Sequence, residues 1–235
     1  MTIRLRNKMG AKCAKSPDAD SEEDLMSSKV GLQTFMILKQ LGAGSFSKVF
    51  LVKHKVTKDL YAMKSINKTT VERLDQVNNT IGERHILENT KSCPFIVDMK
   101  WAFQTGRKLY IVMELMLGGE LYYHLRMYRR FDEMTAKFYL GQVILAFEVL
   151  HSRNVIYRDL KPENILMDAS GYIKVTDFGL SKNYMGSTET RADSFVGTAE
   201  YFAPEVITSG NYTKAIDFWA LGILLFEMLA GNTPF

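Results

Sequence analysis

The sequence predicts an α+β protein of two lobes, in which a small antiparallel β lobe with one main helix precedes a larger helical lobe. From Phe35 to about residue 115, short apolar runs alternate with glycine or polar turns, which is typical of strands. After Gly118 and Gly119, apolar residues recur at helical spacing instead, so the second half is expected to be helical. The two lobes are expected to join near residues 114–119.

The composition is that of a globular protein with no polyanion partner. Of the 235 residues 46% are hydrophobic, and the net charge is only +4; a sizeable core is expected, and a nucleic-acid partner is not. Cys13 and Cys93 lack metal-like spacing, and so few cysteines suit a reducing compartment. The run at 219–230 contains Glu227 and is too short to be a transmembrane segment. We expect an intracellular protein in the cytoplasm, with the nucleus as a second candidate.

Residues 1–34 are expected to form a disordered N-terminal tail, followed by the small lobe at 35–115 and the large lobe at 116–235. The tail begins with basic residues and no acid among them, and an acidic stretch follows at 18–24. The alternative to a free tail is weak contact of the basic part with a membrane surface.

The small lobe is expected to contain five strands and one helix. The helix is the polar segment 71–90, and the turns contain glycine or polar residues. The strands are expected at 35–41, 48–53, 60–66, 96–104 and 108–115.

The large lobe is expected to be built on two apolar helices. The first has a helical stripe formed by Leu140, Val143, Ile144, Phe147 and Leu150. The second, at 215–229, is apolar nearly all round and is expected to be buried.

Gly42 and Gly44 lie between two predicted strands, where the missing Cβ atoms would let backbone N–H groups approach a phosphate. An ordinary hairpin turn is the alternative, because Ser47 replaces the third glycine of a G-x-G-x-x-G pattern. A dinucleotide site is excluded, because a strand and not a helix follows.

Lys64 is a charge on an otherwise apolar strand and needs an anionic partner. Glu83 on the following helix is the candidate. The alternative is a surface lysine whose charge reaches solvent, beside an ordinary helix glutamate.

The segment "VIYRDLKPENILM" at 155–167 places several charges between apolar runs. A solvated turn is the simple interpretation. Asn164 and Asp177 are hard oxygen ligands suited to Mg²⁺. Asp159 is then a candidate acceptor for a hydroxyl proton, and Lys161 a candidate for holding phosphoryl charge.

These motifs together resemble the protein kinase family. Gly42-x-Gly44, Lys64, Glu83, "YRDLKPEN" at 157–164, "DFG" at 177–179 and "APE" at 203–205 occur in that family's order and approximate spacing. The resemblance covers residues 35–235. Tyr157 in place of the usual histidine, together with "GTAEYFAPE", resembles the AGC group that includes the cyclic-AMP-dependent kinase. Lys161 and Thr198 resemble those of Ser/Thr-specific members.

The resemblance implies ATP and two Mg²⁺ ions, with Lys64, Glu83, Asp159 and Lys161 as catalytic residues and Asn164 and Asp177 as metal ligands. It also implies a set of ATP-binding residues, in which Met113 guards the pocket behind the adenine and the backbone at Glu114 and Met116 bonds it. This set is Leu41, Gly42, Ala43, Gly44, Ser45, Phe46, Ser47, Val49, Ala62, Lys64, Met113, Glu114, Met116, Glu120 and Leu166.

Substrate and activation residues are also implied. Glu120 and Glu163 match carboxylates that bind arginines upstream of the acceptor, and Thr198 matches a substrate-binding residue. Ser194 matches the phosphosite of an upstream activating kinase, with Arg158 and Lys182 as its basic partners. A stacked apolar column is implied for Leu87, Met99, Tyr157 and Phe178.

Two alternatives to an active kinase remain at this stage: a truncated inactive kinase or pseudokinase that acts as a regulatory scaffold, and a module that only hydrolyses ATP. The chain also stops earlier than the kinases it resembles, so we expect C-terminal helices to be missing. Glu205 would then lack an arginine partner, and part of the cover would be absent over Trp219, Leu224, Phe226 and Met228.

Overall fold

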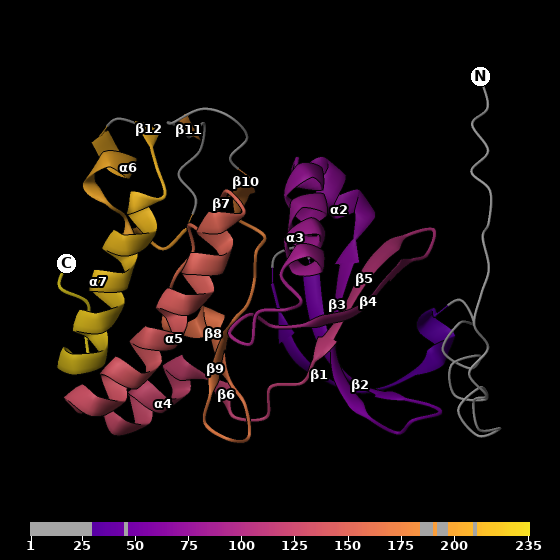
Figure 1. The fold of residues 1–235 in the computed structure, drawn as a ribbon. Coiled ribbons are helices and arrows are strands. Elements are labelled where there is room, and N and C mark those ends of the chain that lie inside the picture. The colour runs from indigo at the N-terminus through magenta and orange to yellow at the C-terminus, as the bar shows by residue number, and fades with distance from the viewer. Residues whose placement is uncertain (1–29, 45–46, 184–189, 192–196, 209–210) are drawn as a thin grey trace, which may run out of the picture.

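The computed structural model of this protein describes residues 30–44, 47–183, 190–191, 197–208 and 211–235. Figure 1 shows two lobes, with the strands β1–β5 and the helices α2 and α3 on one side and the helices α4–α7 on the other. The predicted fold class, a small β lobe followed by a helical lobe, is confirmed. Within the described residues, no helix is long and apolar enough to span a membrane.

The small lobe contains one antiparallel sheet in the order β1-β2-β3-β5-β4. All five predicted strands are present. Their bounds are β1 Phe35–Ala43, β2 Ser47–His54, β3 Leu60–Asn67, β4 Met99–Gln104 and β5 Lys108–Glu114.

The single helix expected at 71–90 is two helices, α2 (Lys68–Arg73) and α3 (Val77–Asn89). The chain changes direction at Asp75, which has a φ of 52°. A residue in the left-handed region cannot continue an α-helix, so the helical segment is interrupted there, and α3 is the one main helix that was predicted.

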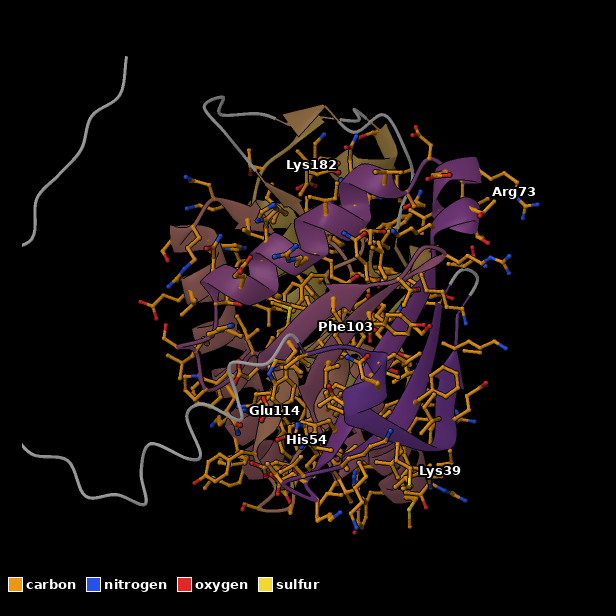
Figure 2. All side chains as sticks on the ribbon, turned by 90° about the vertical axis from the view of Figure 1, so that its right-hand side faces the viewer. Lys39, His54, Arg73, Phe103, Glu114 and Lys182 are labelled. Atoms are coloured by element: carbon orange, nitrogen blue, oxygen red, sulfur yellow. The ribbon has the colours of Figure 1, made fainter. Side chains whose placement is uncertain are left out.

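An aromatic cluster around Phe35 covers one face of the small-lobe sheet. The Phe35 ring lies 5.5 Å from His54 and 6.1 Å from Phe103, and Figure 2 labels both partners. Val30 and Leu32 also pack against this cluster. The short helix η1 (Leu32–Thr34) therefore belongs to the fold, although the sequence analysis placed it in the tail.

The large lobe contains four α-helices among the described residues, with short strands between them. The helices are α4 Leu121–Tyr128, α5 Glu133–Ser152, α6 Pro204–Thr208 and α7 Ala215–Ala230, and two 3₁₀ helices are η2 Pro162–Asn164 and η3 Ala199–Tyr201. The strands are β6 Gly119–Glu120, β7 Val155–Ile156, β8 Ile165–Met167, β9 Ile173–Val175, β10 Lys182–Asn183, β11 Thr190–Arg191 and β12 Asn211–Tyr212.

Helix α5 begins at a side-chain cap, because Asp132 accepts a hydrogen bond of 2.8 Å from the backbone N–H of Thr135. Val143, Phe147 and Leu150 are buried as expected. Ile144 is 43% exposed, so its assignment to the core stripe was wrong. One residue of rotation, about 100°, moves it off the buried face.

Helix α7 is buried along one face only, although its sequence predicted burial all round. Leu224 and Met228 are fully buried, whereas Phe218 and Phe226 are 54% and 45% exposed. Figure 1 shows α7 at the edge of the large lobe, beside α5, so its outer side faces solvent. The expected exposure of Leu224 and Met228 was wrong for the same reason: they lie on the inner face. Trp219 is half-buried.

Glu205 is partly buried and takes part in a contact. The expected lack of an arginine partner, which would be costly for a buried carboxylate, stays a prediction.

Candidate active site

Lys64 contacts two carboxylates, one from each lobe. Its Nζ donates to Glu83 Oε1 of α3 at 2.6 Å and to Asp177 Oδ1, which follows β9, at 3.1 Å. Glu83 is only 3% exposed, so the predicted pair is a buried one and not two surface charges. Burial alone would lower the pKa of Lys64, but the two carboxylates outweigh burial and raise it above its ordinary value. Lys64 is therefore a permanent cation.

Several residues of the expected ATP-binding set lie on neighbouring strands of the small-lobe sheet, and Leu166 lies in the large lobe. Val49 of β2 pairs with Lys64 of β3, and Ala62 of β3 pairs with Met113 of β5. Leu166 of β8 pairs with Glu120 of β6 in the large lobe. Met113 and Met116 are buried in the main core cluster, and Leu41 is 45% exposed on β1.

The glycine turn is open at Gly42. Among the described residues, a Cβ atom at that position would meet no protein atom within 4 Å, and the N–H of Gly44 donates to the carbonyl of Ser47 at 2.8 Å. Phosphate binding by this turn stays a prediction. Ala43 ends β1. Ser45 and Phe46 lie outside the described residues.

Asp159 is the centre of a second group of polar side chains. Lys161 Nζ lies 3.2 Å from Asp159 Oδ1 and 3.3 Å from Thr198 Oγ1. Asn164 Nδ2 donates to Asp159 Oδ2 at 2.7 Å and to its carbonyl at 2.8 Å. Burial raises the pKa of Asp159, and Lys161 and Asn164 oppose this rise. A carboxylate with a raised pKa is a stronger proton acceptor.

Helix α7 holds the backbone of the segment that contains Asp159. Asp217 accepts hydrogen bonds from the N–H groups of Tyr157 and Arg158 at 2.9 and 3.0 Å, and its Oδ2 lies 2.7 Å from His151 Nε2. Arg158 has a φ of 68°, a strained value for a residue with a side chain. These bonds maintain the strained turn that presents Asp159.

The Asn164 and Asp177 side chains fit magnesium as a pair. In both hydrogen bonds of the Asn164 side chain, the donor is its amide nitrogen. Its amide oxygen is therefore available to bind a metal ion. Partial desolvation raises the pKa of Asp177, whose side chain is half-exposed, but Lys64 outweighs this effect and holds the pKa below its ordinary value. Across the part of the chain that the structure describes, no group of three or more His, Cys, Asp or Glu residues could hold a metal ion. Mg²⁺ suits such a sparse site, because it keeps waters and shares phosphate oxygens.

The four residues of the apolar column belong to one core. Leu87, Met99, Tyr157 and Phe178 are each at most 4% exposed and lie in the main core cluster. The rings of Tyr157 and Phe178 meet edge to face at 5.5 Å. The Tyr157 hydroxyl donates to the carbonyl of Thr176 at 2.6 Å, which fixes the chain just before Asp177.

Four glutamates influence one another electrostatically and are called the acidic cluster: Glu120, Glu163, Glu200 and Glu227. Burial and the nearby Glu163 raise the pKa of Glu120. Burial raises the pKa of Glu227, as do Glu163 and Glu200, while a hydrogen bond from the Tyr201 hydroxyl opposes this rise. Only Glu120 and Glu163 were predicted. Glu227 could have been noticed as the only acid in its apolar run.

The activation residues are described in part. Arg158 Nε donates to the carbonyl of Leu180 and Nη1 to the Tyr212 hydroxyl, both at 2.7 Å. Lys182 belongs to β10 and takes part in a contact. Ser194 lies outside the described residues, so its role stays a prediction.

The two-lobed fold, the Lys64–Glu83 pair and the Asp159–Asn164–Asp177 arrangement define a protein kinase domain. The comparison with protein families agrees: the model described as protein kinase domain matches residues 35–235. The chain belongs to the protein kinase family.

Similar curated proteins are named as serine/threonine kinases. Serine/threonine-protein kinase SCH9 of Saccharomyces cerevisiae is 49% identical over 208 residues, which are 87% of this chain and 25% of SCH9. RAC-beta serine/threonine-protein kinase of Homo sapiens is 42% identical over 233 residues, 97% of this chain and 48% of that protein. These relatives confirm the resemblance to the AGC group. The chain spans about a quarter of the first relative and about half of the second.

Proposed function

We propose that this chain is the catalytic part of a serine/threonine protein kinase, which transfers the γ-phosphate of ATP to a serine or threonine hydroxyl of a protein. The observation that carries the proposal is the convergence of Glu83 and Asp177 on the buried Lys64. This arrangement places a permanent cation beside a candidate metal ligand, which is what binding and aligning a nucleotide phosphate chain requires.

Each polar residue then has a role. Lys64 binds the α- and β-phosphates, and Asp159 accepts the hydroxyl proton of the acceptor residue. Lys161 lies between Asp159 and Thr198, and it stabilises the negative charge on the transferring group. Magnesium ions held by Asn164 and Asp177 would neutralise phosphate charge.

The acidic cluster supports a preference for basic substrates. Glu227 lies close enough to Glu163 and Glu200 for their charges to raise its pKa, so the cluster has unfavourable self-repulsion that a cation relieves. Bidentate pairing with carboxylates favours arginine. We therefore expect Arg or Lys two and three residues before the acceptor. An arrayed peptide library checks this, and a preference for acidic or proline-flanked sites would contradict it.

Activation by an upstream kinase at Ser194 is part of the same proposal. A phosphate adds about −1.5 to −2 charge and can order a segment that faces cations. Ser194→Ala is expected to abolish activation by treatment with an upstream kinase. A Ser194→Ala chain that is activated as fully as wild type would exclude this switch.

The test of the main proposal is phosphate transfer by the purified chain. Radiolabelled ATP, Mg²⁺ and a basic serine peptide are expected to give labelled peptide, and Asp159→Asn is expected to give none. Nucleotide binding without any reaction would instead indicate a pseudokinase. Release of inorganic phosphate at equal rates with and without peptide would indicate an ATPase. Either result would overturn the proposal.

A further inference from the structure

The Glu114 side chain is held from both lobes at the end of β5, where the chain passes into the large lobe. Its Oε1 accepts a hydrogen bond of 2.7 Å from the backbone N–H of Asp98 and another of 2.7 Å from Lys174 Nζ. Asp98 precedes β4 in the small lobe, whereas Lys174 lies on β9 in the large lobe. The Glu114 N–H also donates to the Asp98 carbonyl at 3.0 Å. Glu114 is labelled in Figure 2.

The Lys174–Glu114 pair is sheltered from solvent. The two side chains are 19% and 25% exposed, whereas the equally short Lys137–Glu133 pair on α5 is 66% and 73% exposed. Solvent screens the α5 pair almost completely, so it contributes little. The Lys174–Glu114 bond is charge-assisted and partly desolvated, which makes it one of the stronger kinds of hydrogen bond.

Lys174 connects two parts of the proposed nucleotide site. Its cross-strand neighbour is Leu166, which belongs to the expected ATP-binding set, and it lies three residues before Asp177. The next residue, Val175, exchanges backbone hydrogen bonds of 2.9 and 3.0 Å with Phe95 and Val97. Strand β9 is thus already fixed to the segment before Asp98, and the Lys174 side chain adds the bond that reaches Glu114 itself.

We propose that Lys174 is a positioning residue for nucleotide binding, which acts through Glu114. By holding this connecting segment against β9, it fixes the spacing between the backbone of Glu114, expected to bond the adenine, and Asp177, expected to bind the metal. The inference rests on the proposed function in taking the ligand to be ATP. Without the bond, the two halves of the site can separate, and the nucleotide must restore their spacing when it binds.

The test compares Lys174→Met with Lys174→Arg and Lys137→Met in the full chain. The Kd of a fluorescent mant-ATP with Mg²⁺ is measured first, and KM for ATP and kcat for a peptide second. Lys174→Met is expected to raise both Kd and KM by about ten-fold, the scale of one charge-assisted hydrogen bond, with kcat nearly unchanged. Lys174→Arg keeps the charge and is expected to remain within about three-fold of wild type. Lys137→Met is expected to match wild type.

Several results would overturn the inference. One is an unchanged Kd for mant-ATP in Lys174→Met, and another is an equally large rise in Kd in Lys137→Met. A third is a fall in kcat of Lys174→Met as large as its rise in KM, which would place Lys174 at the reacting centre. A merely structural role would lower the unfolding temperature of Lys174→Met without changing the Kd. If the Kd values for mant-ATP follow the expected order among the variants but the wild-type chain transfers no phosphate, the proposed function is refuted and this inference stands. A wild-type chain that binds no mant-ATP would overturn the inference.

Discussion

Lys64 and Asp177 contact each other, yet their environments differ. Substitutions at the two positions are therefore expected to have similar effects on kcat and different effects on stability. The Asp177 side chain is 51% exposed, whereas Lys64 and Glu83 are buried. Asp177→Asn and Lys64→Met are both expected to lower kcat to below about a tenth of wild type, a cost above ~1.4 kcal/mol, because each removes a charge that holds the phosphates. Peptide phosphorylation measures this effect.

Stability provides the control for this pair of variants. Lys64→Met leaves the Glu83 carboxylate buried without a cation and is expected to lower the free energy of unfolding by about 3–5 kcal/mol. Asp177→Asn removes an exposed charge and is expected to change it little. Urea unfolding measures both. Equal stability of the two variants, or more than about a tenth of wild-type kcat in either, would contradict these roles.

At the scale of residues, the sequence predicted which polar side chains gather around Asp159 better than it predicted the neighbours of the glutamates. Asp159, Lys161, Asn164 and Thr198 come together as expected, because the first three lie within six residues of one another and local chain geometry brings them near. Glu227 was missed as a neighbour of Glu163, since their proximity depends on how α7 packs. A sequence records an acid in an apolar run, but not what that acid faces.

Among the elements, α7 is the one that holds the catalytic segment in place. Asp217→Ala would leave the buried N–H groups of Tyr157 and Arg158 without acceptors, at about 1–3 kcal/mol each. We expect the free energy of unfolding to fall by about 2–6 kcal/mol. We also expect kcat to fall by about 100-fold, because Asp159 would no longer be held at its position.

Urea unfolding and peptide phosphorylation check the Asp217 prediction. Glu133→Ala on the exposed side of α5 is the control and is expected to match wild type. Asp217→Asn retains one carbonyl oxygen and is expected to be less damaging than Asp217→Ala. If Asp217→Ala unfolds like wild type, the hydrogen bonds at 2.9 and 3.0 Å do not hold this segment.

The acidic cluster joins β6, η2, η3 and α7, and its titration gives a pH dependence. The pKa values of Glu120 and Glu227 are raised above 4.5, first by burial and then by neighbouring glutamates. Below these raised values the two groups are neutral and attract no arginine; above them they are charged. KM for an arginine-rich peptide is therefore expected to fall as pH increases from 4.5 through the raised pKa values.

A peptide with alanines in place of the upstream arginines is the control for the pH prediction. Asp159 also has a raised pKa, and its titration affects both peptides alike. The ratio of the two kcat/KM values therefore isolates the acidic cluster. A ratio that stays constant as the pH increases would show that these glutamates do not bind the substrate.

For the whole molecule, the sequence predicted the division into lobes but not which face of each helix is buried. A change of hydrophobic period is a local signal, so the β lobe and the helical lobe were both found. Burial depends on partners distant in the chain. Ile144 and Phe226 are as apolar as their buried neighbours, and only the packing of α5 against α7 determines that they face solvent.

Exposed apolar side chains on the outer face of α7 have a consequence for the behaviour of the whole molecule. Phe226 and Leu229 are both exposed there, and contiguous apolar surface favours association. We expect sedimentation velocity of residues 1–235 to show a mean mass that increases with concentration. Phe226→Ser combined with Leu229→Ser is expected to shift the chain toward monomer. Its unfolding free energy is expected to stay within about 1 kcal/mol of wild type, because surface substitutions usually have small effects.

Met134→Ser removes an exposed apolar side chain at the start of α5 and is expected to leave the association unchanged. A wild-type chain that stays monomeric at every concentration, or a Met134→Ser chain that dissociates as fully as the α7 variant, would show that this face does not drive association.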